Sequence, residues 1–184
     1  MILIYCNKTF PRIEYTFNHI FKLILNKNFS ITNSKSEFID FKGHKLSYAN
    51  APISDELFFQ SNGLLEERGL ENHEITIFEW DNVKCFFRVG QKSAMPFDIF
   101  SAIFFLLSRY EEYMPHSSNN HSQFSHLQSI AHKENFLEIP LVDIWIKKLI
   151  YLFENKINLK CKIDKKNQID SIIISLLRPY KYIN

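Results

Sequence analysis

The segment from Pro96 to Tyr113 constrains the fold more than any other part of the chain. It has the sequence PFDIFSAIFFLLSRYEEY, in which a nearly uninterrupted apolar run is followed by an ionic and aromatic cluster. A helix this apolar does not suit a protein surface, and the run is too short to span a bilayer. The sequence therefore predicts a buried helix over residues 97–113, with Asp98 near its N-terminus, where a carboxylate complements the helix dipole.

The composition is that of a globular protein with one hydrophobic core. The chain has 184 residues, of which 46% are hydrophobic and 23% are charged. These values fit a single folded domain and do not fit a disordered chain. The formal net charge of +2 is too small to indicate a nucleic-acid partner. The basic stretch Lys156–Lys166 is interpreted as a solvated segment.

The cysteines and the N-terminus indicate where the protein is located. Cys6, Cys85 and Cys161 are odd in number and widely separated, which argues against a disulfide framework and for a reducing compartment. The apolar run at the N-terminus is too short for a signal peptide and has no basic flank. We therefore expect a cytoplasmic protein, with neither a membrane nor a nucleic acid as its partner.

The spacing of apolar residues predicts an α/β fold: a single domain with a mixed β-sheet and three main helices. Residues 2–6 form a continuous apolar run, typical of a strand buried on both faces, and an amphipathic pattern near 11–25 predicts a helix. Phe29 and Ile31 indicate a second strand, so the chain is expected to begin with a βαβ unit. The other two helices are expected near 97–113 and 140–155.

A β-hairpin is predicted near residues 75–89. Two apolar runs flank Asp81 and Asn82, a pair that tolerates the positive φ angles of a tight turn. Further strands are expected around Leu46–Tyr48 and residues 56–59.

Arg109, Glu111 and Glu112 are the candidate catalytic residues. Arg109 and Glu112 lie three residues apart, so they can pair on a helix, while Glu111 points elsewhere, toward a distant base or a partner. Two carboxylates can perform acid–base catalysis when burial raises the pKa of one of them. The neighbouring guanidinium is expected to lower that pKa instead. A structural ion pair is therefore favoured over a catalytic pair.

His116, His121 and His126 are the candidate metal ligands. They lie in the polar segment from Met114 to Glu138, which also contains His132. No two of these four histidines are four residues apart, the spacing that places two imidazoles on one helix face. A loop could still bring them together with a glutamate to bind zinc. Histidines in a solvated loop are the favoured interpretation, and no cofactor is expected.

The segment PFDIFSAIFFLLSRYEEYMP, from Pro96 to Pro115, resembles the N-terminal region of a group of bacterial polysaccharide-deacetylase-family proteins, typical of Bacteroidota. In that group a domain of uncharacterised function precedes a carbohydrate-esterase barrel. The likeness also includes Pro52–Phe58, Gly63–Leu65, Phe78–Asp81, His121–Phe124, Ser129–Ala131 and Asn135–Pro140, and ends near Trp145. The chain departs from the group's pattern at Ser122 and Gln123, where a glycine and an arginine are expected.

The resemblance implies an accessory domain over residues 1–165, followed at 166–184 by a tail at the position where the catalytic barrel would start. No residue of this chain matches the metal-binding residues of such barrels, so the resemblance implies no metal ligand here. The favoured function is a non-catalytic accessory or interaction domain whose partner is a deacetylase-type catalytic domain or a carbohydrate. The alternative is a stand-alone hydrolase, metal-dependent or carbohydrate-directed, that uses the Arg109 and Glu111 cluster and the histidine-rich loop.

Overall fold

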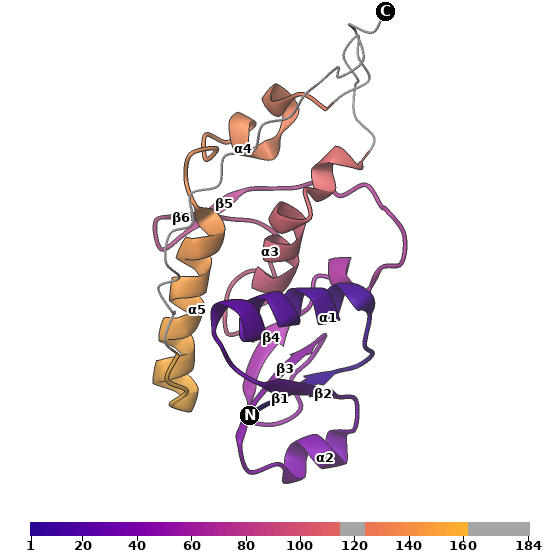
Figure 1. The fold of residues 1–184 in the computed structure, drawn as a ribbon, viewed down its shortest axis with the longest axis vertical. Helices are drawn as coiled ribbons and strands as arrows, with labels where there is room; N and C mark the ends of the chain where they lie inside the picture. The colour runs from indigo at the N-terminus through magenta and orange to yellow at the C-terminus, as the bar shows by residue number, and fades with distance from the viewer. Residues whose placement is uncertain (115–123, 162–184) are drawn as a thin grey trace, which may run out of the picture.

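A four-stranded parallel β-sheet forms the N-terminal part of the structure, a computed structural model that describes residues 1–114 and 124–161 (Figure 1). Its strands are β1 (Ile2–Cys6), β2 (Phe29–Thr32), β3 (His44–Ala49) and β4 (Leu57–Gln60), in the spatial order β2-β1-β3-β4. All five residues of β1 are buried, as its continuous apolar sequence predicts for a strand covered on both faces. The predicted βαβ start is confirmed.

Helices cover both faces of the sheet. Helix α1 (Pro11–Phe17) continues into the π-helix η1 (Asn18–Ile24), which confirms the helix predicted near 11–25. The short helix α2 (Lys35–Asp40), which was not predicted, lies against the opposite face (Figure 1). The chain therefore changes face between β1 and β3. Ligands of such sheets commonly bind beyond the carboxyl ends of the strands at this switch point.

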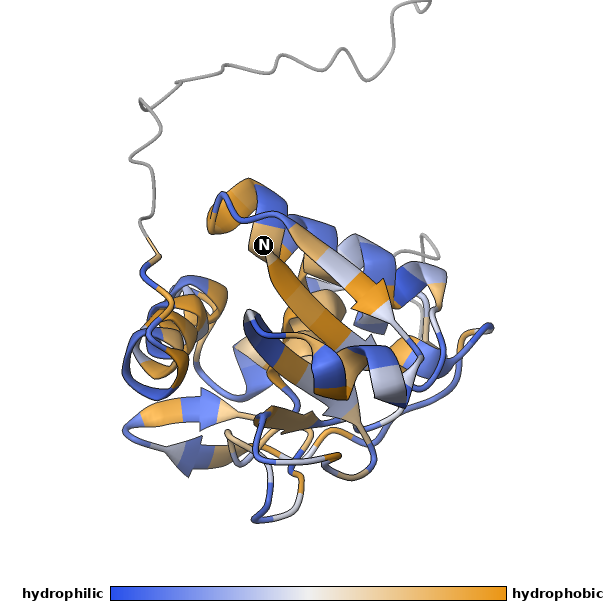
Figure 2. Cartoon of the chain, turned by 90° about the horizontal axis from the view of Figure 1, so that it is seen from below, coloured by the Kyte–Doolittle hydropathy of each residue, from blue (hydrophilic) through white to orange (hydrophobic). Residues whose placement is uncertain are grey.

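Phenylalanine side chains fill the main core on the α1 face. The ring of Phe100 lies 5.0 Å from that of Phe17 and 5.1 Å from that of Phe59, both in edge-to-face orientation. Such contacts add to the free energy gained by burying the rings. Figure 2 shows β1, the strand that starts at the N-terminus, as largely hydrophobic, whereas many loop residues are hydrophilic.

The predicted hairpin is confirmed as an antiparallel pair, β5 (Phe78–Trp80) and β6 (Val83–Cys85). Asp81 and Asn82 form its turn with φ angles of 50° and 58°, the left-handed conformation that a tight hairpin turn requires. The parallel and antiparallel pairings of this α/β domain thus lie in two separate sheets.

Helix α3 (Ile99–Leu107) is the central apolar helix, and six of its nine residues are buried. The main-chain N–H of Ser101 donates to the Asp98 carboxylate, which confirms Asp98 as the N-terminal cap. The helix ends before the predicted residue 113. The Ser108 hydroxyl donates to the carbonyl of Phe104, and Arg109 has a left-handed φ of 53°. A side chain that competes for helix carbonyls favours such an end. The chain then forms the 3₁₀ turn η3 (Tyr110–Glu112).

Helix α5 (Leu141–Ile157) confirms the helix predicted near 140–155. The remaining short helices are η2 (Leu64–Glu66), η4 (His126–Gln128) and α4 (Ile130–Lys133). The proposed tail at 166–184 lies outside the described residues. Within the described ranges, no helix has both the length and the apolar character needed to cross a membrane.

Candidate ligand-binding site

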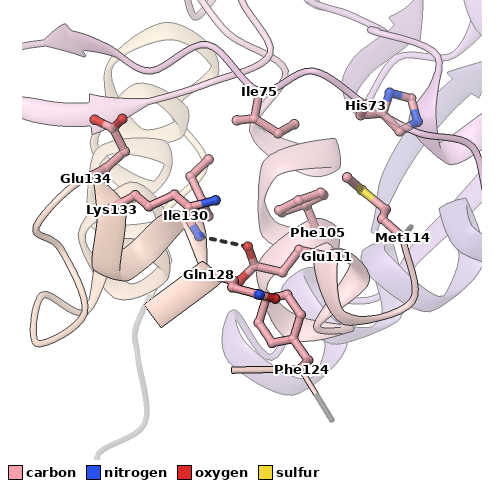
Figure 3. A pocket seen from close by; sticks show the side chains of 10 residues that line it. All are labelled: His73, Ile75, Phe105, Glu111, Met114, Phe124, Gln128, Ile130, Lys133 and Glu134. Atoms are coloured by element: carbon pink, nitrogen blue, oxygen red, sulfur yellow. Dashed lines mark hydrogen bonds between the residues drawn. The ribbon is translucent and has the colours of Figure 1, made fainter. Parts of the chain in front are cut away.

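A cavity of about 340 Å³ lies between the end of α3 and the segment that carries η4 and α4 (Figure 3). Its volume is within the usual range of small-molecule pockets, about 300–1,000 Å³. Its walls combine apolar side chains with carboxylate, amide, imidazole and ammonium groups. The lining residues are His73, Ile75, Phe105, Glu111, Met114, Phe124, Gln128, Ile130, Lys133 and Glu134.

Glu111 is the one candidate catalytic residue of the sequence analysis that lines this cavity. The preceding residue, Tyr110, is buried and anchors η3 in the core. The carboxylate of Glu111 then accepts a 2.8 Å hydrogen bond from the main-chain N–H of Ile130, the first residue of α4 (Figure 3). Glu111 therefore joins the end of α3 to α4 across the cavity.

The pKa of Glu111 is raised, and burial is the largest cause. The hydrogen bond from Ile130 and the charge of Lys133 act in the opposite direction, while the charge of Glu112 raises the pKa further. Our expectation that the neighbouring guanidinium lowers this pKa is wrong, because Arg109 is directed at Glu112. Burial has therefore increased the proton affinity of the Glu111 carboxylate.

Arg109 and Glu112 form the predicted ion pair beside the cavity. Nε of Arg109 lies 2.5 Å from Oε1 of Glu112, and the Arg109 side chain is 73% exposed. An ion pair this exposed contributes little to stability, about 0–1 kcal/mol. Neither residue is among those that line the cavity, so the structure separates them from Glu111.

The structure brings together only part of the predicted histidine cluster. His116 and His121 lie outside the described residues. His126 lies in η4 with its ring 5.8 Å from that of His132. Within residues 1–114 and 124–161, no three or more His, Cys, Asp or Glu side chains are arranged to hold a metal ion. The zinc-site hypothesis therefore stays a prediction.

A network around Glu67, not foreseen from the sequence, fixes one wall of the cavity. Arg12 donates to the carbonyl of Leu64 at 2.7 Å and to Glu67 at 3.1 Å, and its guanidinium lies 5.2 Å from the centre of the Tyr110 ring. His73 lies 2.9 Å from the same Glu67 carboxylate. The network thus connects the start of α1 to the irregular segment after η2 and holds His73 at the cavity.

The wall chemistry suits a polar ligand that also has an apolar face. Ile75 and Phe124 provide apolar contact, while the amide of Gln128 and the carboxylates of Glu111 and Glu134 are hydrogen-bonding groups. A few polar groups within apolar walls are typical of pockets that orient a small ligand.

A family model described as a "Family of unknown function (DUF7033)" matches residues 2–158. The match spans both sheets, the cavity and the whole of α5. A search of curated proteins and a search of solved structures each gave no match. The chain therefore belongs to the family of unknown function DUF7033.

Proposed function

We propose that this chain is a non-catalytic accessory domain that recognises a carbohydrate in the Glu111 cavity. The observation that carries the proposal is the combination of a partly exposed aromatic ring, that of Phe124, with carboxylate, amide and imidazole groups in one cavity. A sugar ring presents C–H faces, which pack on aromatic rings, and hydroxyl groups, which must be hydrogen-bonded when they are buried.

The partner in this proposal is a deacetylase-type catalytic domain. Its support is the sequence resemblance, whose most specific segment, Pro96 to Pro115, supplies Phe105, Glu111 and Met114 to the cavity walls. The accessory domain would then hold a glycan close to the catalytic domain. The whole assignment to polysaccharide deacetylases and to bacterial carbohydrate metabolism is part of the proposal.

Exposed apolar side chains between α3 and α5 support contact with a partner domain. Among the described residues of this segment, four large apolar side chains are more than two-fifths exposed: Tyr113, Leu127, Leu137 and Ile139. Exposed apolar side chains of this kind are available for contact with a partner. A cytoplasmic location is also proposed, and its support is that Cys6, Cys85 and Cys161 are free thiols.

Isothermal titration of the chain with the N-acetylglucosamine tetramer tests the recognition step. Glu111→Gln removes the charge but keeps an acceptor for the N–H of Ile130, so the fold should survive. We expect this variant to bind about tenfold more weakly, a loss of about 1.4 kcal/mol. Glu112→Gln is the matched control, because Glu112 lies outside the cavity, and its affinity should equal that of the wild type. If the wild type and both variants bind the tetramer with equal affinity, the Glu111 cavity is not the binding site. If the wild type does not bind the tetramer, a carbohydrate of this class is not the ligand.

The second candidate function is a hydrolase, favoured by the raised pKa of Glu111, a property of general acids. Release of acetate or of shorter glycans from the tetramer separates the two functions. The accessory domain binds without releasing either product. Turnover by the purified chain that Glu111→Gln abolishes and Glu112→Gln preserves would establish the hydrolase instead.

A further inference from the structure

A second cavity, of about 360 Å³, lies on the other side of the segment before β5. His73 and Ile75 of this segment line the Glu111 cavity, whereas Glu74 and Thr76 line the second one, together with Phe78, the first residue of β5. Asn62, Phe87 and Arg88 complete its polar and aromatic walls. None of the residues that line the second cavity also lines the first, so the two can be tested independently.

The guanidinium of Arg88 is the positively charged group among the residues that line the second cavity. It lies over the ring of Phe78, 3.8 Å from the ring centre. Stacking of this kind uses the face of the guanidinium and leaves its N–H groups, which point outward in its plane, available to a ligand. Within the part of the chain that the structure describes, those N–H groups make no hydrogen bond or ion pair.

The backbone on both sides of Arg88 is fixed. Phe87 has a left-handed φ of 60°, which is rare for an aromatic residue. Its carbonyl accepts a 2.9 Å hydrogen bond from the N–H of Asp98, and the N–H of Val89 donates to the carbonyl of Pro96 at 3.1 Å. The segment is therefore held against the start of α3, which fixes the backbone position of Arg88 before any ligand binds, while its side chain is exposed.

We propose that the second cavity binds the carboxylate of an acidic sugar. The guanidinium offers two parallel N–H groups that match the two oxygens of a carboxylate. Glu74 lines the same cavity, and its negative charge disfavours a doubly charged group such as phosphate more than a singly charged one. Thr76 and Asn62 provide polar side chains for the hydroxyl groups of the sugar ring. The inference goes beyond the proposed function, since it concerns different residues and a charged ligand.

NMR titration with sodium glucuronate, glucose and inorganic phosphate tests the proposal. Glucuronate should bind more tightly than either other probe. Arg88→Ala should weaken glucuronate binding at least tenfold, and Arg88→Lys should also weaken it, because an ammonium group cannot make the paired contact. Glu74→Gln should tighten glucuronate binding by removing a like charge.

Arg109→Ala is the matched control, because Arg109 is an exposed arginine far from this cavity in sequence and pairs with Glu112. Its glucuronate affinity should equal that of the wild type, and thermal unfolding of each variant establishes that it is folded. If Arg88→Ala is unfolded, the glucuronate affinity of Arg88→Lys alone tests the role of Arg88, because this variant keeps a positive charge and a long side chain. Glucose or phosphate binding as tightly as glucuronate would overturn the proposal, as would unchanged affinity in the folded Arg88 variants.

Discussion

The hydroxyl group of Tyr48 donates a 2.8 Å hydrogen bond to the carboxylate of Asp98, and both side chains are buried. The same carboxylate accepts hydrogen bonds from the main-chain N–H of Asn62, from the hydroxyl of Ser101 and from its main-chain N–H. Asp98 thus ties β3, the turn after β4 and the start of α3 together. Four donors directed at one buried group make it a structural centre of the domain.

Asp98→Ala should destabilise the protein by about 3 kcal/mol or more, because it leaves several buried donors without an acceptor. Tyr48→Phe should cost less, about 1–2 kcal/mol, because the carboxylate keeps three donors. The substitution also removes the acceptor of the Ser61 hydroxyl, which donates to the Tyr48 oxygen at 3.2 Å. Urea unfolding measures both values. Asp40→Asn, which changes an exposed aspartate, is the control and should change stability by less than about 0.5 kcal/mol. A loss of that small size for Asp98→Ala would contradict the structural role.

Arg12→Lys should loosen the segment after η2. A lysine cannot reproduce the guanidinium contacts to the carbonyl of Leu64, to Glu67 and to the carbonyl of Gly69. Hydrogen exchange of residues 64–73 should accelerate, and the free energy of unfolding should fall by about 1–2 kcal/mol. The matched control is Arg68→Lys, an exposed arginine of the same segment. Equal exchange rates in the two variants would show that the Arg12 network does not hold the segment.

Glu56 should make stability increase with pH. Partial burial raises its pKa, but hydrogen bonds from the N–H of Ile53, the hydroxyl of Ser47 and the N–H of Ser54 outweigh burial, so the pKa is lowered overall. The unfolded state then binds more protons than the folded state in the range between the two pKa values. The contribution of Glu56 is present above the unfolded pKa of about 4.3 and is lost as pH falls through the folded pKa.

Urea unfolding of wild type and Glu56→Gln between neutral and acidic pH measures this contribution. The stability difference between the two proteins should be largest near neutral pH and should shrink as the pH falls below about 4.3. Asp55→Asn, at the exposed neighbouring position, is the control. A difference that stays constant over the whole range would contradict the lowered pKa.

Glu111 should have the opposite effect, because its pKa is raised by burial. Here the folded state binds more protons than the unfolded state, so the contribution is complete below the unfolded pKa and is lost as pH rises through the folded pKa. Glu111→Gln should therefore become more stable relative to the wild type as the pH rises from about 4 to 7. Parallel measurements on Glu112→Gln provide the comparison. A relative stability of Glu111→Gln that falls over this range would contradict the direction of the shift.

Local signals account for what the sequence predicts well. The hairpin follows from Asp81 and Asn82, which adopt positive φ angles, and α3 and α5 follow from their apolar patterns. Helix α2 was missed because it is only six residues long and buries a single side chain, that of Phe38. The early end of α3 depends on Ser108 and Arg109, whose effect on the backbone is not visible in an apolar pattern.

The candidate site is only partly predictable, because it is assembled from distant segments. The i,i+3 spacing correctly pairs Arg109 with Glu112 and directs Glu111 elsewhere. The hydrogen-bond partner of Glu111, Ile130, is 19 residues away in sequence, and Glu67, which pairs with Arg12, is 55 residues away. No local spacing in the sequence therefore reveals either pair. One signal was available: Arg12 follows the carboxyl end of β1, where parallel sheets commonly bind ligands.

The most direct test of the central claim maps binding of the N-acetylglucosamine tetramer onto the amide signals of the ¹⁵N-labelled chain. If the Glu111 cavity recognises the glycan, the amides of Glu111, Gln128 and Ile130 should shift in proportion to bound ligand. The amide signals of β2, which contributes no side chain to the cavity, should not shift. Glu111→Gln should abolish most of the shifts, whereas Glu112→Gln should preserve them. Saturable shifts confined to other parts of the chain, or shifts unchanged in Glu111→Gln, would contradict the claim.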